Sequence, residues 1–386
     1  MNQDKFKIDD SKIAFHPERV NQWLNAQENR DMQLKVYPIY LEISPVGRCN
    51  HRCTFCAVDY LEYESKNVLN SEILKERLSE MGNLGVKSIM YAGEGEPLLH
   101  KDLASIINHT KEKSGIDVAI TTNATPLTEK FVYESLSSIT WIKASINAGN
   151  MKDYSAIHRT PEKHFELVWK NMKKAVEIRR ELGLNHDEHT LGAQMVLIPE
   201  NSNSILDFAK IAKDSGLDYA VIKPYSQHKS SLTTSHKELK YEQFLYLEEE
   251  LKKLNDKNFQ VIFREKTMKL LNINHKQNYE VCPSTPFMWG YIMATGEVYG
   301  CSAYLKDERF LYGNINNQSF QKIWEGEKRR KAIEFVENEL DISQCRENCH
   351  MRQVNIFLDN VQRMKNIQNE SKKNNSQNTP LHVNFI

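Results

Sequence analysis

Six short apolar segments alternate with segments of helical periodicity between residues 37 and 225, and this alternation constrains the fold most strongly. A repeated strand–helix pattern indicates a parallel sheet, because parallel neighbours need a crossover connection, and such crossovers are right-handed. The predicted strands are 39–43, 86–91, 117–121, 141–146, 194–198 and 219–223, and the predicted helices between them are 70–81, 100–113, 128–136, 162–182 and 204–215. The sequence therefore predicts an α/β fold that forms a partial (β/α)6 TIM-like open barrel.

Polar or glycine-rich residues follow every predicted strand. In barrel-like folds the functional groups lie at the carboxyl ends of the strands, so we expect the site at this edge of the sheet. Six units fall short of a closed barrel and leave a lateral mouth wide enough for a large substrate. Lys223, Tyr225 and His228 follow the sixth strand and should face the cavity, but no catalytic acid or base is assigned.

The charge balance and the hydropathy exclude several classes of partner. Lys plus Arg and Asp plus Glu both number 51, so no net field attracts nucleic acid or an anionic membrane. No apolar run is long enough to span a bilayer, and the first residues lack the apolar stretch of a signal peptide. We expect a cytoplasmic protein with no nucleic-acid or membrane partner.

Three of the seven cysteines, Cys49, Cys53 and Cys56, follow the first predicted strand with the spacing C-x3-C-x2-C. Clustered cysteines in a reducing compartment indicate metal ligands or catalysis rather than disulfides. Three thiolates are one fewer than an iron–sulfur cluster usually has, and one fewer than a closed structural zinc site needs. A cluster held by three cysteines leaves one iron with an open position. On spacing alone, zinc and an iron–sulfur cluster both remain open.

The other four cysteines lie towards the C-terminus. Cys282 stands alone, Cys301 follows Gly296 in a G-x4-C pattern, and Cys345 and Cys349 form a C-x3-C pair. Four thiolates match a four-cysteine iron–sulfur cluster, and structural zinc is the competing interpretation.

The residues around the first cysteine loop favour an iron–sulfur cluster over zinc. Phe55 gives the loop the form C-x3-C-x-aromatic-C, and 92–97 (AGEGEP) after the second strand is similar to a G-G-E-P element with Glu94 replacing one glycine. In these features the chain resembles the radical S-adenosylmethionine (SAM) enzymes. The G-x4-C hairpin and the trailing cysteine pair resemble the SPASM/Twitch extension of that superfamily, which would make the C-terminal part a small α+β iron–sulfur extension.

The resemblance implies cofactors and site residues. Cys49, Cys53 and Cys56 would hold a [4Fe–4S] cluster whose fourth iron is chelated by SAM, and one electron would cleave SAM to a 5′-deoxyadenosyl radical that abstracts hydrogen from substrate. The remaining cysteines (Cys282, Cys301, Cys345 and Cys349) would hold one auxiliary [4Fe–4S] cluster, since a full SPASM domain with two clusters carries more. The expected SAM-binding residues are Phe55, Gly93, Glu94, Gly95, Glu96, Asn123, Ser145 and Arg159, while Asn147 replaces an acidic residue often seen in the family. A flavodoxin- or ferredoxin-type protein would supply the electron.

Three functions follow. The first is net oxidation of a small molecule, such as an alcohol or a sugar, with the auxiliary cluster accepting an electron. The second is modification of a peptide or protein, which is disfavoured because 1–36 is too short for a leader-binding domain. The third, from another class, is a zinc-binding structural protein.

The expected domains are a polar segment (1–36), a radical SAM core (37–235), a helical connector (236–280), an auxiliary-cluster domain (281–352) and a C-terminal helix with a flexible tail (353–386). Within them we expect a hairpin formed by 287–293 and 297–301, and helices at 319–338 and 351–366. The segment 366–379 is low in apolar residues and should be flexible. For the apolar end, 381–386, docking on the body and fraying are both open.

Overall fold

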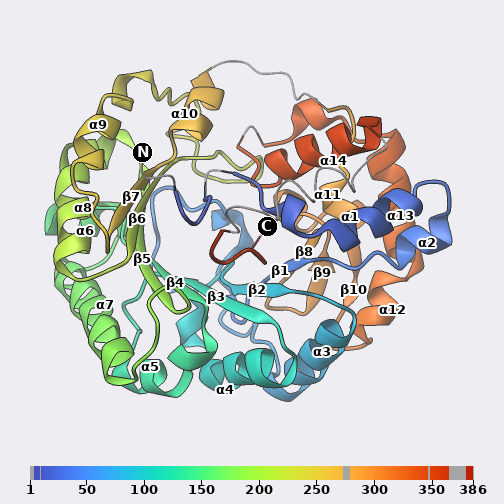
Figure 1. The fold of residues 1–386 in the computed structure, drawn as a ribbon, viewed down its shortest axis with the longest axis horizontal. Helices are drawn as coiled ribbons and strands as arrows, with labels where there is room; N and C mark the ends of the chain where they lie inside the picture. Colours follow the sequence, from blue (N-terminus) through green and yellow to red (C-terminus); the bar gives the residue numbers. More distant parts are fainter. Residues whose placement is uncertain (1–3, 9, 273–278, 347, 365–379, 386) are drawn as a thin grey trace.

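A computed structural model describes residues 4–8, 10–272, 279–346, 348–364 and 380–385 of the chain. Its centre is one ten-stranded sheet with the order β10-β9-β8-β1-β2-β3-β4-β5-β6-β7. The strands are β1 (Tyr40–Ile43), β2 (Ser88–Tyr91), β3 (Asp117–Thr122), β4 (Trp141–Ser145), β5 (Thr190–Leu197), β6 (Tyr219–Pro224), β7 (Gln260–Phe263), β8 (Trp289–Ile292), β9 (Glu297–Tyr299) and β10 (Leu311–Asn314). Strands β1 to β7 pair in parallel, which confirms the predicted α/β open barrel (Figure 1).

Helices cover the outer face of the parallel strands (Figure 1). They are α3 (Ser71–Asn83), α4 (Leu103–Asn108), α5 (Glu129–Ser135), α6 (Met151–His158), α7 (Lys163–Glu181), α8 (Ile205–Asp214), α9 (Leu247–Lys252) and α10 (Glu265–Asn272). Their apolar faces and the outward side chains of the strands make the main core, in which Leu74, Phe208 and many neighbours are fully buried. Asn70 and Thr128 cap α3 and α5 with their side-chain oxygens, which fixes where these helices begin.

The connector differs from its prediction. Residues 236–280 were expected to be mostly helical, but Gln260–Phe263 forms β7, a seventh parallel strand beside β6. The apolar run 261–263 is only three residues long and lies between lysine-rich segments, so helical propensity dominates any sequence window that contains it. Pairing with β6 decides its conformation, as tertiary context often does for short apolar runs.

Two helix predictions also differ in detail, and one helix was missed. The segment 100–113 divides into α4 and a π-helical stretch, His109–Lys113. The segment 319–338 divides at Gly326 into α12 (Phe320–Trp324) and α13 (Glu327–Asn338). Helix α6 was not predicted.

The C-terminal region continues the barrel sheet rather than standing apart from it. The predicted hairpin is present as β8 and β9, and β8 pairs in parallel with β1. Helices α11 (Ser284–Phe287), α12, α13 and α14 (Arg352–Met364) pack around this part of the sheet. Because β1 lies between β2 and β8, the loop that follows β1 lies between the barrel and the C-terminal region.

The N-terminal segment packs into a second hydrophobic core, which it shares with the C-terminal region. Helices α1 (Pro17–Asn25) and α2 (Arg30–Leu34) bury Val20 and Trp23 together with residues of the C-terminal region. The guanidinium of Arg329 on α13 is fully buried, and it donates to the carbonyl oxygens of Leu34 and Val36, each at 3.0 Å. These bonds satisfy a buried cation and tie the two ends of the sequence together.

The last described residues dock on the body. Phe385 packs against Trp141 at a ring distance of 5.2 Å, and the Ser88 hydroxyl donates to the carbonyl of Asn384. Ser88 and Trp141 are the first residues of β2 and β4, so this segment lies at the amino end of the barrel (Figure 1). The predicted flexible stretch 366–379 lies outside the described residues. Among the described residues, no helix combines the length and apolar character needed to cross a membrane.

Candidate iron–sulfur and S-adenosylmethionine site

The first cysteine loop follows β1 and is held by backbone hydrogen bonds from two sides. The amide of Thr54 donates to the carbonyl of Ile157 at 2.9 Å, which attaches the loop to α6. The amide of Glu96 donates to the carbonyl of Arg48 at 2.9 Å, which attaches it to the loop after β2. The position of Cys49, Cys53 and Cys56 is therefore set by two neighbouring βα units.

The three thiols are half-buried, unpaired with one another, and line a common cavity. Burial raises the pKa of Cys49 to about 11 and that of Cys56 above its ordinary value. Burial and then the neighbouring Cys56 and Cys49 raise the pKa of Cys53 further. Gathering three thiolates here is unfavourable without a cation, and a metal cluster would supply that charge and displace the protons. The donor set fits a three-cysteine cluster.

Two histidines lie beside Cys53. His158 Nδ1 is 3.2 Å from Cys53 Sγ and 3.2 Å from His51 Nδ1, and the three ligand atoms lie within 4.8 Å of one another. Burial lowers the pKa of His158 to about 4 and that of His51 to about 3, so both rings are neutral at pH 7. Sequence reasoning missed this arrangement, although His51 stands inside the cysteine motif and His158 precedes the predicted Arg159.

The glycines of 93–97 bring backbone against the cysteine loop. A Cβ on Gly95 would lie 2.2 Å from the carbonyl oxygen of Val46 and 2.3 Å from that of Arg48. Gly93 has φ +112°, and a Cβ there would lie 2.6 Å from Cβ of Ser44. Only glycine fits at either position, because the loop packs directly on the segment that carries the cysteines.

The two glutamates of this loop point to different partners. Glu94 is buried, and its carboxylate accepts from the amide of Ala294 at 2.9 Å, in the turn between β8 and β9. The structure therefore places its side chain away from the cavity. Glu96 lines the cavity and accepts from Asn123 N at 2.7 Å and Thr122 Oγ1 at 2.5 Å, while burial raises its pKa to about 7.

Some of the other predicted SAM-binding residues line the cavity, and others do not. Phe55, Asn123 and Ser145 line the cavity, as do Gly93 and Gly95. Arg159 is exposed with a left-handed backbone at the end of α6 and does not line the cavity, whereas His158 does. Asn147 braces the strand ends, because its side-chain oxygen accepts from Val196 N at 2.8 Å.

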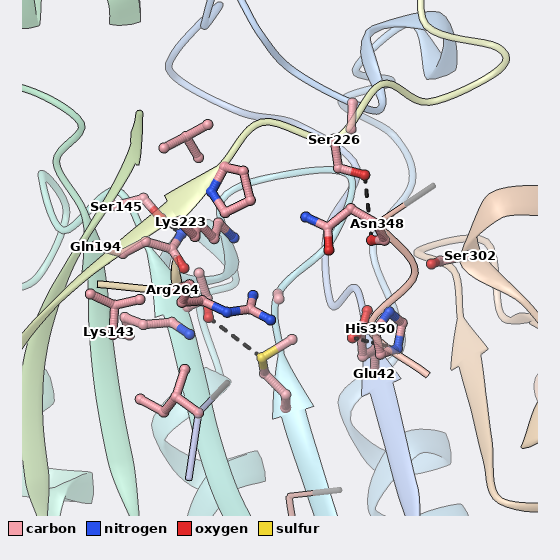
Figure 2. Close-up of a pocket in the computed structure, with 18 of the residues that line it drawn as sticks. Glu42, Lys143, Ser145, Gln194, Lys223, Ser226, Arg264, Ser302, Asn348 and His350 are labelled. Carbon is pink, nitrogen blue, oxygen red and sulfur yellow. Dashed lines mark hydrogen bonds and ion pairs between the residues drawn. The ribbon is translucent and has the colours of Figure 1, made fainter. Parts of the chain in front are cut away.

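The cavity has a volume of about 640 Å³ and runs from the cysteine loop through the barrel interior to its amino end, where Phe385 lines it. Figure 2 shows polar side chains from several strands pointing into it, among them Glu42, Lys143, Gln194 and Lys223. Lys223 and Tyr225 line the cavity as the sequence suggested. His228 does not line it, and its ring nitrogen lies 3.2 Å from the carbonyl of Ser302.

The four C-terminal cysteines come together in space. Cys282, Cys301, Cys345 and Cys349 line a second, small cavity of about 40 Å³. Burial is the main cause that raises the pKa of Cys349 to about 12 and that of Cys301 well above its ordinary value. Asn355 Nδ2 donates to Cys282 Sγ at 3.2 Å, which prepares that sulfur to carry negative charge, and the Cys282 thiol donates to Thr285 Oγ1 at 3.3 Å.

The two cavities share part of their walls. Cys349, Arg346, His350 and Ser302 line both of them. The large cavity is therefore bordered by the first cysteine loop on one side and by a member of the four-cysteine set on another.

Comparisons with known proteins agree with this arrangement. A family model described as the radical SAM superfamily matches residues 43–212, and one described as an iron–sulfur cluster-binding domain (SPASM) matches residues 282–350. Residues 43–212 are a radical SAM domain. The C-terminal part of the chain is a SPASM domain, which confirms the resemblance drawn from the cysteine motifs.

Among curated relatives, GTP 3′,8-cyclase of Aquifex aeolicus (strain VF5) is 32% identical over 187 residues, which are 46% of this chain and 53% of the cyclase. The chain spans about half the length, or less, of the first curated relatives it matches. Among solved structures, Streptococcus suis SuiB bound to S-adenosylmethionine has a TM-score of 0.62 at 18% identity, covering 77% of this chain and 68% of SuiB. SuiB bound to the precursor peptide SuiA has a TM-score of 0.61 at 18% identity, covering 77% and 67%. This likeness shows the fold alone.

The two matched domains imply SAM, a [4Fe–4S] cluster that binds it, and an auxiliary cluster, as predicted. The three-thiol and four-thiol donor sets of this structure fit both groups.

Proposed function

We propose that this chain is a radical SAM oxidoreductase that oxidises a small molecule held in the barrel cavity between two iron–sulfur centres. The observation that carries the proposal is the cavity of about 640 Å³, which Cys49, Cys53 and Cys56 line together with Cys349 of the C-terminal set. A substrate in this cavity would lie within reach of both centres. Removal of a hydrogen atom and then of an electron is together a two-electron oxidation.

In this proposal Cys49, Cys53 and Cys56 hold the SAM-binding cluster, and Cys282, Cys301, Cys345 and Cys349 hold one auxiliary [4Fe–4S] cluster. Bound SAM and its cluster supply a 5′-deoxyadenosyl radical, and the auxiliary cluster supplies an electron acceptor. The backbone at Gly93 and Gly95, with Glu96, Asn123, Ser145 and Phe55, forms the wall against which SAM would bind. Glu94 and Arg159 keep indirect roles, because their side chains do not line the cavity.

The protein's own contribution is to position the cysteine loop and to cover one end of the cavity. Two neighbouring units hold the cysteine loop, and the docked segment 380–385 lies across the amino end of the barrel. Covering this end of the cavity limits the access of water to a reactive radical, which protects it from side reactions.

A small-molecule substrate is supported by charged and polar side chains that lie deep in the barrel, on β1, β4 and β6. The alternative is a peptide, which SuiB binds on the same fold. If the substrate is a peptide, we expect short peptides to compete for the site, and small organic acids and sugars not to compete.

The domain boundaries at 36, 235, 280 and 352 stay predictions, as does a cytoplasmic location. We further propose a flavodoxin- or ferredoxin-type electron donor, because reduction of a buried cluster to a low potential needs a one-electron carrier.

Anaerobic reconstitution with iron and sulfide tests the cofactor assignment. We expect a brown protein with about eight iron atoms per chain, in two clusters of about four. Zinc would leave the protein colourless. With dithionite and SAM, the reconstituted protein should form 5′-deoxyadenosine. Absence of deoxyadenosine from a fully loaded protein would contradict the proposal.

A further inference from the structure

A cluster of cations lines the barrel cavity, on β4 and near the carboxyl ends of β6 and β7. Lys143 on β4, Lys223 on β6 and Arg264 directly after β7 extend into the same space, with Glu42 of β1 and His350 across from them (Figure 2). Arg346 of the C-terminal region lines the same cavity, and its Nε donates to the Ser226 hydroxyl at 3.0 Å. Four permanent or potential cations thus surround one carboxylate.

The two lysines lack counterions. Within the described part of the chain, neither the Lys143 nor the Lys223 ammonium makes a hydrogen bond or an ion pair, and the Lys143 ammonium instead lies 4.9 Å from the centre of the Trp141 ring. The carboxylate of Glu42 accepts from the Tyr40 hydroxyl at 3.0 Å.

A structural cation elsewhere in the same molecule shows the contrast. Arg179 is buried behind the sheet, and it makes a two-pronged ion pair with Asp218, one contact being 3.0 Å. A buried cation that serves only the fold is normally paired in this way, or hydrogen-bonded to carbonyls as Arg329 is, because an unsatisfied buried charge costs several kcal/mol. The lysines in the cavity have no such partner, which indicates that their partner is a ligand.

The pKa values of the two lysines agree with a positive charge that lacks an anionic partner. Burial, followed by Lys143, Arg264 and Arg346, lowers the pKa of Lys223 to about 7, while Glu42 opposes the shift. Burial, followed by Arg264, lowers the pKa of Lys143 to about 8, and Glu42 again opposes the shift. His350, the remaining titratable group facing Lys223, is kept neutral mainly by burial, which lowers its pKa to about 3.

We infer that the barrel interior recognises a phosphoryl group on the substrate, held by Lys143 and Lys223 with Arg264 and Arg346 around it. Two lysines without a counterion leave a positive charge that a dianion matches better than a single carboxylate does. The inference rests on the proposed function, since it names the chemical class of that substrate as a phosphorylated small molecule. Lys143 lies two residues before Ser145 on the same face of β4, and Lys223 lies near the carboxyl end of β6, so the phosphoryl group would lie beside the SAM wall, between β4 and β6.

Calorimetric titration of the reconstituted, SAM-loaded protein tests the inference. Inorganic phosphate and pyrophosphate are compared with acetate at equal ionic strength. We expect phosphate to bind at least about tenfold more tightly than acetate, with pyrophosphate tighter still. At pH 8, phosphate binding should take up a proton, seen as different heats in two buffers, because an anion raises the depressed pKa of Lys223.

Variants supply the controls. Lys143→Met and Lys223→Met should each weaken phosphate binding about tenfold, while Lys130→Met on the outer surface, where the side chain is 82% exposed, should not change it. Glu42→Gln should strengthen binding about threefold, a gain that a folding defect cannot produce. Equal affinity for phosphate and acetate, or wild-type affinity in both lysine variants, would overturn the inference.

This experiment separates the two proposals. Phosphate binding does not need a reduced cluster, and deoxyadenosine formation does not need phosphate. A protein that cleaves SAM but ignores phosphate refutes only the substrate class. A protein that binds phosphate through the lysines but fails to cleave SAM refutes only the proposed reaction.

Discussion

The two cysteine sites of this chain differ in how many thiols they bring together and in what those thiols face. The first has three thiols from one loop, and they line a cavity of about 640 Å³. The second has four thiols from separate segments before α11, after β9 and before α14, and they enclose about 40 Å³. The first leaves room for a ligand that the protein does not supply. The second can complete a cluster from its own residues.

The residues that surround the two cysteine sites also differ. Beside the first site lie titratable groups, His51, His158 and Glu96. Beside the second, the groups that form hydrogen bonds with sulfur are an amide and two hydroxyls, those of Asn355, Thr285 and Tyr304. These surroundings fit an open site, the three-thiol site, where ligands exchange. They also fit a closed site, the four-thiol site, which only transfers electrons.

Removing one thiol from the open site should have the largest effect. Cys53→Ala should lower deoxyadenosine formation by at least about a thousandfold, because two thiolates cannot hold a cluster able to bind SAM. Chromatographic measurement of deoxyadenosine after reduction with dithionite gives the result. Wild-type cleavage in this variant would remove the basis for assigning the loop to SAM.

Removing one thiol from the closed site should act differently. Cys349→Ala should lose about half of the bound iron but keep deoxyadenosine formation within about tenfold of the wild type, because the first site remains intact. Coupled oxidation of any substrate should stop. Iron analysis and the deoxyadenosine assay on one sample separate the two effects, and complete loss of cleavage would mean that the sites are not independent.

Gly95→Ala tests how the open site is held. The added methyl group would lie 2.2 Å from the carbonyl oxygen of Val46, so the cysteine loop must shift. We expect SAM cleavage to fall at least about tenfold while the iron of the closed site is kept. Gly183→Ala is the matched control, because a Cβ added there would have no atom within 4 Å, despite the φ of +65°. A full loss of iron from both sites would show a global folding defect instead.

Asn355→Leu should have the smallest effect and should be confined to the closed site. Asn355 Nδ2 donates to Cys282 Sγ at 3.2 Å, and a hydrogen bond of about 1 kcal/mol to sulfur corresponds to about 40 mV for a one-electron couple. The potential of the closed-site cluster should become more negative by about that amount, with that of the open site unchanged. Redox titration followed by electron paramagnetic resonance checks both values, and an equal shift at both clusters would contradict the assignment.

The sequence predicts much of the fold because most of its strands and helices show their own periodicity. The strands β1 to β6 and the helices α3, α5, α7 and α8 lie close to their predicted bounds. Strand β7 was missed because its three apolar residues, 261–263, are flanked by lysine-rich segments. The parallel pairing of β8 with β1 was also missed, since no local pattern specifies a partner some 250 residues away.

The site was predictable where a motif carries it. All seven cysteines and most of the residues expected to bind SAM gather around the two cavities. Lys143 and Glu42 gave no signal, because a single charged residue inside a strand looks like an ordinary outward-facing position until the barrel curvature turns it inward. The direction of Glu94 depends on the β8–β9 turn, which is distant in sequence.

One measurement tests the contrast between an open and a closed site most directly. Each reduced cluster is observed alone by electron paramagnetic resonance, with and without SAM, in variants that lack the other site: Cys301→Ala with Cys349→Ala for the open site, and Cys49→Ala with Cys53→Ala for the closed site. We predict that SAM changes the spectrum of the first protein and leaves that of the second unchanged. A spectrum of the first protein that SAM does not alter, or a change in the second, would contradict the account.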